Sequence, residues 1–172
     1  MIPNLIGKNR LIQPDDPSVA RLTPFLLRDT PIETAKAACE WVHRAITYKP
    51  ELRTDIWQPP SITLLGTGDC EDMSLLLASI LLKMKIPVKL TYGLLEGRPH
   101  VWVETIPEGK YVFEPTSGEI IPWEKRFDEG YLEILYISPT SIYPQPASPI
   151  GIFGFVMVKV NKVVEKVIRG EQ

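Results

Sequence analysis

Two side chains that can act together as a thiol nucleophile and its base, Cys70 and His100, lie thirty residues apart in the sequence. Cys70 sits in the segment Gly-Asp-Cys-Glu-Asp at 68–72, where we expect a helix to begin, and His100 starts a strand-like run at 100–106. Enzymes commonly assemble a cysteine and a histidine from such distant segments. If the two side chains meet, the chain is an acyl-transfer enzyme.

The position of Cys70 predicts an activated thiol. The pKa of a thiol falls at a helix N-terminus and beside an imidazolium, and both effects are expected here. The backbone amide of Cys70 would also point toward the oxyanion that forms during attack on a carbonyl. A second oxyanion donor must be a side chain, and Gln58 and Trp57 in the preceding loop are the candidates.

Three carboxylates surround this cysteine, and each would favour the neutral thiol if it faced the sulfur. We therefore expect them to point elsewhere. Asp69 can cap the helix, and Asp72 can lie against its positive end. Alternatively, Asp69 and Glu71 contribute to a calcium site, although two carboxylates alone are an incomplete shell.

A catalytic histidine needs a third group that fixes its tautomer. Glu114 is the predicted partner of His100, because it ends the next strand and adjacent antiparallel strands can place the two side by side. Glu104 shares strand parity with His100. Four residues along a strand span about 13 Å, however, which is beyond hydrogen-bond reach.

Other cysteine, histidine and tryptophan residues have plainer interpretations. Cys39 falls on the apolar stripe of a predicted helix and is interpreted as a packing residue. His43 is interpreted as a partly exposed helix residue. Trp57 and Trp102 are more often packing residues than oxyanion donors. Cys70 differs from these because its neighbours are glycine and carboxylates.

Local signals predict the elements that position these residues. A threonine cap, a proline and a glutamate at Thr30, Pro31 and Glu33 start a helix that an apolar stripe extends to about residue 47. Prolines and glycines make 49–68 mainly loop. The almost wholly apolar stretch 74–84 predicts a central helix that is enclosed on every side.

The second half of the chain predicts an antiparallel sheet. Residues 88–95, 100–106 and 110–113 form successive strands separated by turns, and 120–121 and 132–137 add short strands. The fold class is therefore α+β, with the buried helix that carries the cysteine packed on the sheet.

The domain prediction is one catalytic domain at 1–140, with its core at about 30–118, and an extension at 141–172. The extension combines a proline-rich linker, a strand at 152–160 and an amphipathic helix at 160–168. Its predicted role is to dock a partner, and attachment to a membrane surface is the less favoured alternative.

Composition excludes several classes of protein. The net charge of -2 and the 23% of charged residues argue against a nucleic-acid surface. No stretch is long and apolar enough to span a membrane, and no signal peptide is recognised. The expected location is therefore cytoplasmic, and the two cysteines are expected to be free thiols.

These motifs resemble those of the transglutaminase-like branch of the papain-like cysteine enzymes. The resemblance covers roughly residues 30–118 and rests on Gly-Asp-Cys-Glu-Asp at 68–72, His-Val-Trp-Val-Glu at 100–104 and Glu-Pro-Thr at 114–116. It implies a papain-like core with a triad of Cys70, His100 and Glu114. The family's usual third residue is aspartate, which is one methylene shorter than Glu114.

The resemblance also suggests an activity. It implies a cysteine peptidase or amidohydrolase that needs no cofactor and cleaves a peptide or isopeptide bond through an acyl-enzyme. Transamidation of glutamine by the same mechanism, or a catalytically silent binding module, are the alternatives. Bacterial relatives that are cysteine proteinases bind calcium through the acidic residues flanking the cysteine, and Asp69 and Glu71 match those positions. Such relatives act in the periplasm, whereas no export signal is recognised here.

Overall fold

The computed structural model describes residues 7–50, 56–106 and 111–144. Its helices and strands, with η for a 3-10 helix, are η1 (Lys8–Leu11), α1 (Pro17–Leu26), α2 (Pro31–Ala45), β1 (Thr47–Tyr48), α3 (Pro60–Thr63), β2 (Thr67–Gly68), α4 (Cys70–Lys83), β3 (Val88–Leu95), β4 (Arg98–Thr105), β5 (Tyr111–Glu114), β6 (Glu119–Pro122), η2 (Trp123–Lys125), β7 (Tyr131–Ile137) and β8 (Ile142–Pro144).

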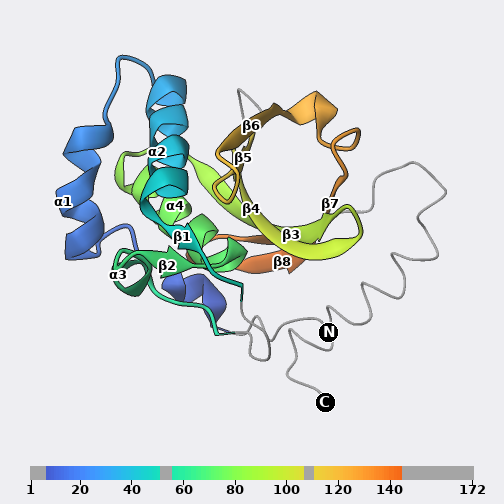
Figure 1. Ribbon diagram of the computed structural model, residues 1–172, viewed down its shortest axis with the longest axis horizontal. Helices are drawn as coiled ribbons and strands as arrows, with labels where there is room; N and C mark the ends of the chain where they lie inside the picture. The colour runs from blue at the N-terminus through green and yellow to red at the C-terminus, as the bar shows by residue number, and fades with distance from the viewer. Residues whose placement is uncertain (1–6, 51–55, 107–110, 145–172) are drawn as a thin grey trace.

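The main sheet has the strand order β6-β5-β4-β3-β7-β8, and every neighbouring pair is antiparallel. The predicted meander is confirmed, and so is the addition of later strands to the same sheet. Glu96 and Gly97 make the tight turn between β3 and β4, and both adopt positive φ values. Strands β1 and β2 form a separate parallel pair. Figure 1 shows α1, α2 and α3 on one side, the curved main sheet on the other and α4 between them.

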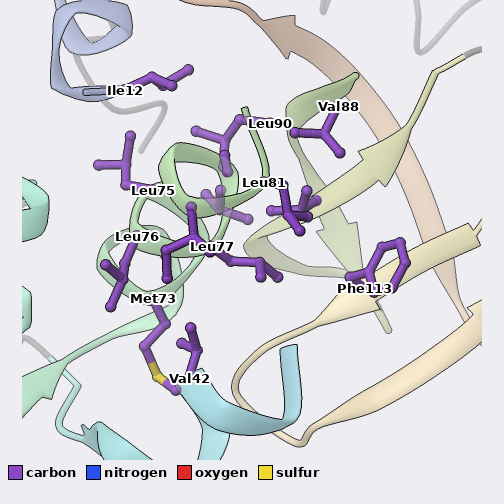
Figure 2. Packing of buried hydrophobic residues seen from close by; sticks show 14 of the residues in the cluster. Ile12, Val42, Met73, Leu75, Leu76, Leu77, Leu81, Val88, Leu90 and Phe113 are labelled. Carbon is purple, nitrogen blue, oxygen red and sulfur yellow. The ribbon is translucent and has the colours of Figure 1, made fainter. Parts of the chain in front are cut away.

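The cysteine-bearing helix α4 is the centre of the core. Nearly all of its side chains are buried, as its apolar sequence predicted. The helix packs against α1, α2 and α3 and against strands β3 and β4. Figure 2 shows leucines of α4 meeting apolar side chains from α2, β3 and β5. The predicted α+β class, with a buried central helix on an antiparallel sheet, is confirmed.

Helix α2 agrees with the prediction at its start. The Thr30 hydroxyl accepts a hydrogen bond from the Glu33 amide, and it donates to the Glu33 carboxylate. The helix ends at Ala45, where the chain turns into the short strand β1. The segment 49–68 was predicted as mainly loop, but it also contains α3 and β2.

Helix α1 was not predicted, and its proline explains why. Pro24 lies inside the helix, where it removes an amide donor. The Thr23 hydroxyl donates instead to the Ala20 carbonyl, which is the group that Pro24 leaves without its usual partner. The start of the helix carries the same signal as α2, with an Asp16 side-chain cap before Pro17.

The C-terminal extension is only partly within the described residues. The stretch 138–149 was predicted as a linker, yet β8 within it pairs with β7 and belongs to the main sheet. The predicted strand at 152–160 and helix at 160–168 lie outside the described residues. Among the helices that are described, none combines the length and the apolar character required to cross a bilayer.

The buried helix α4 gives a testable stability difference. We expect Leu77→Ala to lower the free energy of unfolding by about 2–5 kcal/mol, because Leu77 is fully buried and the deletion leaves a cavity. Leu65→Ala is the matched control, since Leu65 is 81% exposed. It should change the free energy by less than about 0.5 kcal/mol. Urea unfolding measures both, and equal losses would contradict the assignment of α4 as the core.

Candidate functional site

The cysteine stands at the first residue of α4, directly after a tight approach of two backbone segments. Gly68 pairs with Tyr48 across the β1–β2 ladder. A Cβ atom on Gly68 would lie 2.8 Å from the Asp72 Cβ and 3.1 Å from the Thr63 Cγ2. Only glycine leaves room for Asp72 here, so Gly68 sets the position at which α4 begins.

The first turns of α4 are bound to strand β4 at Val101. The buried Ser74 hydroxyl donates to the Val101 carbonyl at 2.9 Å. The Val101 amide hydrogen-bonds the Cys70 sulfur, which lowers the pKa of the thiol. Both backbone groups of Val101 therefore contact α4, and the sulfur lies beside the residue that directly follows His100.

The structure brings His100 and Glu114 together, as neighbours on β4 and β5. The His100 Nε2 atom lies 2.7 Å from the Glu114 Oε2 atom. An ionised carboxylate only accepts, so Nε2 carries the hydrogen in the neutral ring and Nδ1 is the nitrogen that can take a proton.

Glu104 has a different role from Glu114. It accepts a hydrogen bond from the Trp102 indole at 2.7 Å and pairs with Lys89 at 2.9 Å. Glu104 therefore binds Trp102 and Lys89, while Glu114 is the carboxylate that holds His100. Trp102 is fully buried and is therefore a packing residue with a satisfied indole N–H.

The environment of the thiol differs from the prediction. The carboxylates were expected to point away from the sulfur, but the Cys70 thiol donates to Glu71 Oε2 at 3.1 Å. Burial raises the pKa of Cys70, and the charge and hydrogen bond of Glu71 and the charge of Asp69 raise it further. The expected depression of this pKa was therefore wrong for the resting site, where the thiol is protonated.

Asp72 connects the start of α4 to one of the predicted oxyanion donors. Its carboxylate accepts from the Gln58 backbone amide at 2.7 Å and from the Gln58 side-chain Nε2 at 2.6 Å. It also accepts from the Asp69 amide at 3.4 Å, which completes a capping box. Burial raises the pKa of Asp72 to about 6 against these bonds. The Gln58 nitrogen keeps a second hydrogen that an oxyanion can accept.

The other predicted oxyanion donor, Trp57, is a core residue. It is 4% exposed and packs in the main hydrophobic cluster, and the Lys8 Nζ lies 5.3 Å from its ring centroid. The packing interpretation therefore fits Trp57 better than the oxyanion role.

A tyrosine that sequence reasoning did not assign lies at the site. Tyr48 is 47% exposed on β1, opposite Gly68. Burial raises the pKa of Tyr48, and the negative charges of Asp69, Glu71 and Glu114 raise it further. The position of Tyr48 just after the predicted helix, which the apolar stripe extends to about residue 47, was the available signal.

The described side chains do not form a prepared calcium shell. No group of three or more histidine, cysteine or acidic side chains within 7–50, 56–106 and 111–144 could hold a metal ion. The Asp72 oxygens bind Gln58, and the Glu71 carboxylate accepts from the thiol. Calcium at Asp69 and Glu71 would require Glu71 to leave the sulfur.

Cys39 and His43 have the surroundings that the sequence predicted for them. Cys39 is fully buried in the core and is a free thiol, and burial raises its pKa to about 12 with smaller effects from Glu114 and Glu40. Cys70 is a free thiol as well. His43 is exposed on α2, and its Nδ1 atom lies 3.0 Å from the Thr116 carbonyl oxygen.

Solved structures that share this fold include LapG from Legionella pneumophila and a protein from Cytophaga hutchinsonii. LapG from Legionella pneumophila aligns with a TM-score of 0.65 and 14% identity over 83% of this chain and 86% of that chain. A calcium-bound form of LapG aligns with a TM-score of 0.55 and 16% identity over 86% of this chain and 97% of that chain. A Cytophaga hutchinsonii protein, whose description is that of a candidate cysteine protease, aligns with a TM-score of 0.59 and 16% identity. The alignment covers 84% of this chain and 53% of that chain.

The family follows from a match to the sequence itself. No curated protein matches the chain. The model of the transglutaminase-like superfamily matches residues 25–113, which is just over half of the chain and spans Cys70 and His100. The match and the shared fold agree with the geometry at the start of α4. The chain therefore belongs to the transglutaminase-like superfamily.

Proposed function

We propose that this protein is a cysteine peptidase or amidohydrolase that cleaves a peptide or isopeptide bond through a Cys70 acyl-enzyme. The observation that carries the proposal is the 2.7 Å contact between His100 Nε2 and Glu114 Oε2, on the strand whose Val101 amide bonds the Cys70 sulfur. This contact leaves His100 Nδ1 as the base. A thiol, a base and an orienting carboxylate are the parts that acyl transfer needs.

In the proposed first step, His100 Nδ1 takes the Cys70 proton while the sulfur attacks the carbonyl carbon. The Cys70 amide and the free hydrogen of Gln58 Nε2 stabilise the resulting oxyanion. The intermediate then expels the amine, which receives the proton from His100, and a thioester remains. Water attacks the thioester with His100 again as base, so that a carboxylic acid leaves and the thiol is restored.

Hydrolysis is preferred over transamidation because no feature of the described residues identifies a site for an acceptor amine. Product mass tests the choice. Glutamine-containing peptides incubated with the protein and a labelled primary amine should give cleavage products whose summed mass exceeds that of the substrate by one water, or deamidated products in which water has replaced ammonia. Incorporation of the amine with loss of ammonia would overturn the hydrolase and favour the transamidase. Cys70→Ala, which lacks the nucleophile, is the control for both reactions.

A silent binding module is the alternative from a different class. Because the resting thiol is protonated, simple titration of Cys70 does not separate it from an enzyme. Acylation by p-nitrophenyl acetate distinguishes an enzyme from a silent module. This small ester requires no specific substrate groove, but the attack of the thiol on it still needs a base. An enzyme should release nitrophenol in a Cys70-dependent burst, whereas a silent module would react no faster than a free thiol.

Calcium has no step in the proposed reaction. One solved form of LapG is calcium-bound and another was treated with EGTA. In the present chain the Glu71 carboxylate accepts from the thiol, and Gln58 binds Asp72, which is not one of the two calcium candidates. A protein or peptide is the proposed substrate. The cytoplasmic location and the docking role of the extension stay predictions.

A further inference from the structure

The third triad position holds glutamate, and the longer side chain has more partners than His100 alone. Glu114 Oε1 accepts from the backbone amide of Thr116 at 3.1 Å and from the Thr116 hydroxyl. Glu114 Oε2 accepts from His100 at 2.7 Å and from the Tyr131 hydroxyl at 3.3 Å. Each carboxylate oxygen therefore has two donors, so the group cannot rotate without breaking bonds.

Tyr131 reaches this carboxylate from a strand that is remote in the sheet. It begins β7, which pairs with β3, whereas Glu114 ends β5 on the other side of β4. Tyr131 is 3% exposed, and its ring meets that of Trp102 edge-on, with centroids 5.1 Å apart. Burial and the charge of Glu114 raise the pKa of Tyr131, so its hydroxyl keeps its hydrogen and stays a donor. The packing on Trp102 fixes the direction of that donor.

Thr116 is fixed by contacts with helix α2. Its carbonyl oxygen lies 3.0 Å from the His43 Nδ1 atom. Two residues later, Gly118 adopts a φ of +78°, and a Cβ there would lie 3.0 Å from the His43 ring. Because Gly118 has no side chain, the turn after β5 can pack directly against α2. This packing keeps Thr116 next to the Glu114 carboxylate.

We propose that Tyr131 and Thr116 are positioning residues that adapt the triad to glutamate, by clamping the Glu114 carboxylate in the orientation that His100 requires. The proposal rests on the proposed function, because it assigns a task to residues that touch Glu114 and not the substrate. It explains how the site keeps its contact with His100 although glutamate is one methylene longer than the family's usual aspartate. A longer side chain has one more rotatable bond, and these donors restrict it.

A double-mutant cycle tests the clamp. Tyr131→Phe removes only a hydroxyl, and we expect it to slow acylation by p-nitrophenyl acetate roughly three- to tenfold, the range for one lost hydrogen bond. In a Glu114→Gln background the same change should slow the reaction by less than about 1.5-fold, because no carboxylate remains to be held. Tyr136→Phe is the matched control, since Tyr136 is another buried tyrosine of β7.

Thr116 provides the second arm. Thr116→Val keeps the shape of the side chain but lacks the hydroxyl, and it should slow acylation by a similar factor. Thr116→Ser keeps the hydroxyl and should restore the rate, which loss of packing alone would not predict.

The outcomes separate the clamp from the proposed function. If Glu114→Gln slows acylation but Tyr131→Phe acts no more strongly than Tyr136→Phe, the clamp is overturned and the enzyme stands. An equal effect of Tyr131→Phe in both backgrounds also overturns the clamp, because the hydroxyl then acts independently of Glu114. If Glu114→Gln and His100→Ala both leave the rate unchanged, the proposed function and the clamp fall together.

Discussion

His100→Ala is expected to slow the burst of nitrophenol release from p-nitrophenyl acetate about a thousandfold, within the range for losing a general base. This large effect is expected because the resting Cys70 thiol is protonated and needs a base before it can attack. Burial, Glu71 and Asp69 all raise the pKa of Cys70, so very little thiolate exists before the reaction starts. The proton must leave during the attack, and His100 Nδ1 is the nitrogen that the Glu114 contact leaves available. Stopped-flow absorbance measures the burst.

Chemical rescue distinguishes a lost base from a damaged fold. Imidazole added to the His100→Ala protein should restore part of the rate, because a small base can enter the space that the ring occupied. The thermal unfolding midpoint checks that the variant remains folded, because the mostly buried His100 side chain also pairs with Glu114 and its loss lowers stability as well. A variant that reacts within tenfold of the unmodified protein would contradict the role of His100 as base.

The parts of the site that the sequence predicted are those set by local signals and strand pairing. The Gly-Asp-Cys-Glu-Asp segment predicts a helix start because a glycine, a capping carboxylate and the beginning of an apolar stretch lie within a few residues of one another. The approach of Glu114 to His100 follows from two adjacent antiparallel strands, which the turn residues define.

The parts that were missed depend on contacts between distant segments or on a side-chain rotamer. Tyr131 lies 17 positions from Glu114, and its strand joins the sheet on the far side of β3, an order that periodicity does not specify. The hydrogen bond between Cys70 and Glu71 is a rotamer choice between adjacent residues. A charge argument predicted that Glu71 would avoid the sulfur, but a protonated thiol can donate to a carboxylate, which reverses that argument.

The contact between Cys70 and Glu71 leads to the second large effect. Glu71→Gln should speed the alkylation of Cys70 by iodoacetamide at pH 7 about tenfold or more, because a neighbouring like charge commonly moves a pKa by one unit or more. The sign follows from the raised pKa of Cys70. Below that pKa the thiolate fraction grows as the pKa falls, so removal of the negative charge increases it. Peptide mass spectrometry measures the rate at Cys70 separately from buried Cys39.

The comparison of two substitutions separates charge from hydrogen bonding at Glu71. Glutamine still offers an oxygen to the thiol, so Glu71→Gln removes the charge alone, while Glu71→Ala removes both and should react faster still. Glu124→Gln, at an exposed position of η2, is the control and should leave the rate unchanged. A Glu71→Gln rate at or below that of the unmodified protein would mean that Glu71 does not restrain the nucleophile. An increase at Cys70 without any faster acylation would mean that His100, and not the pKa of the thiol, limits the attack.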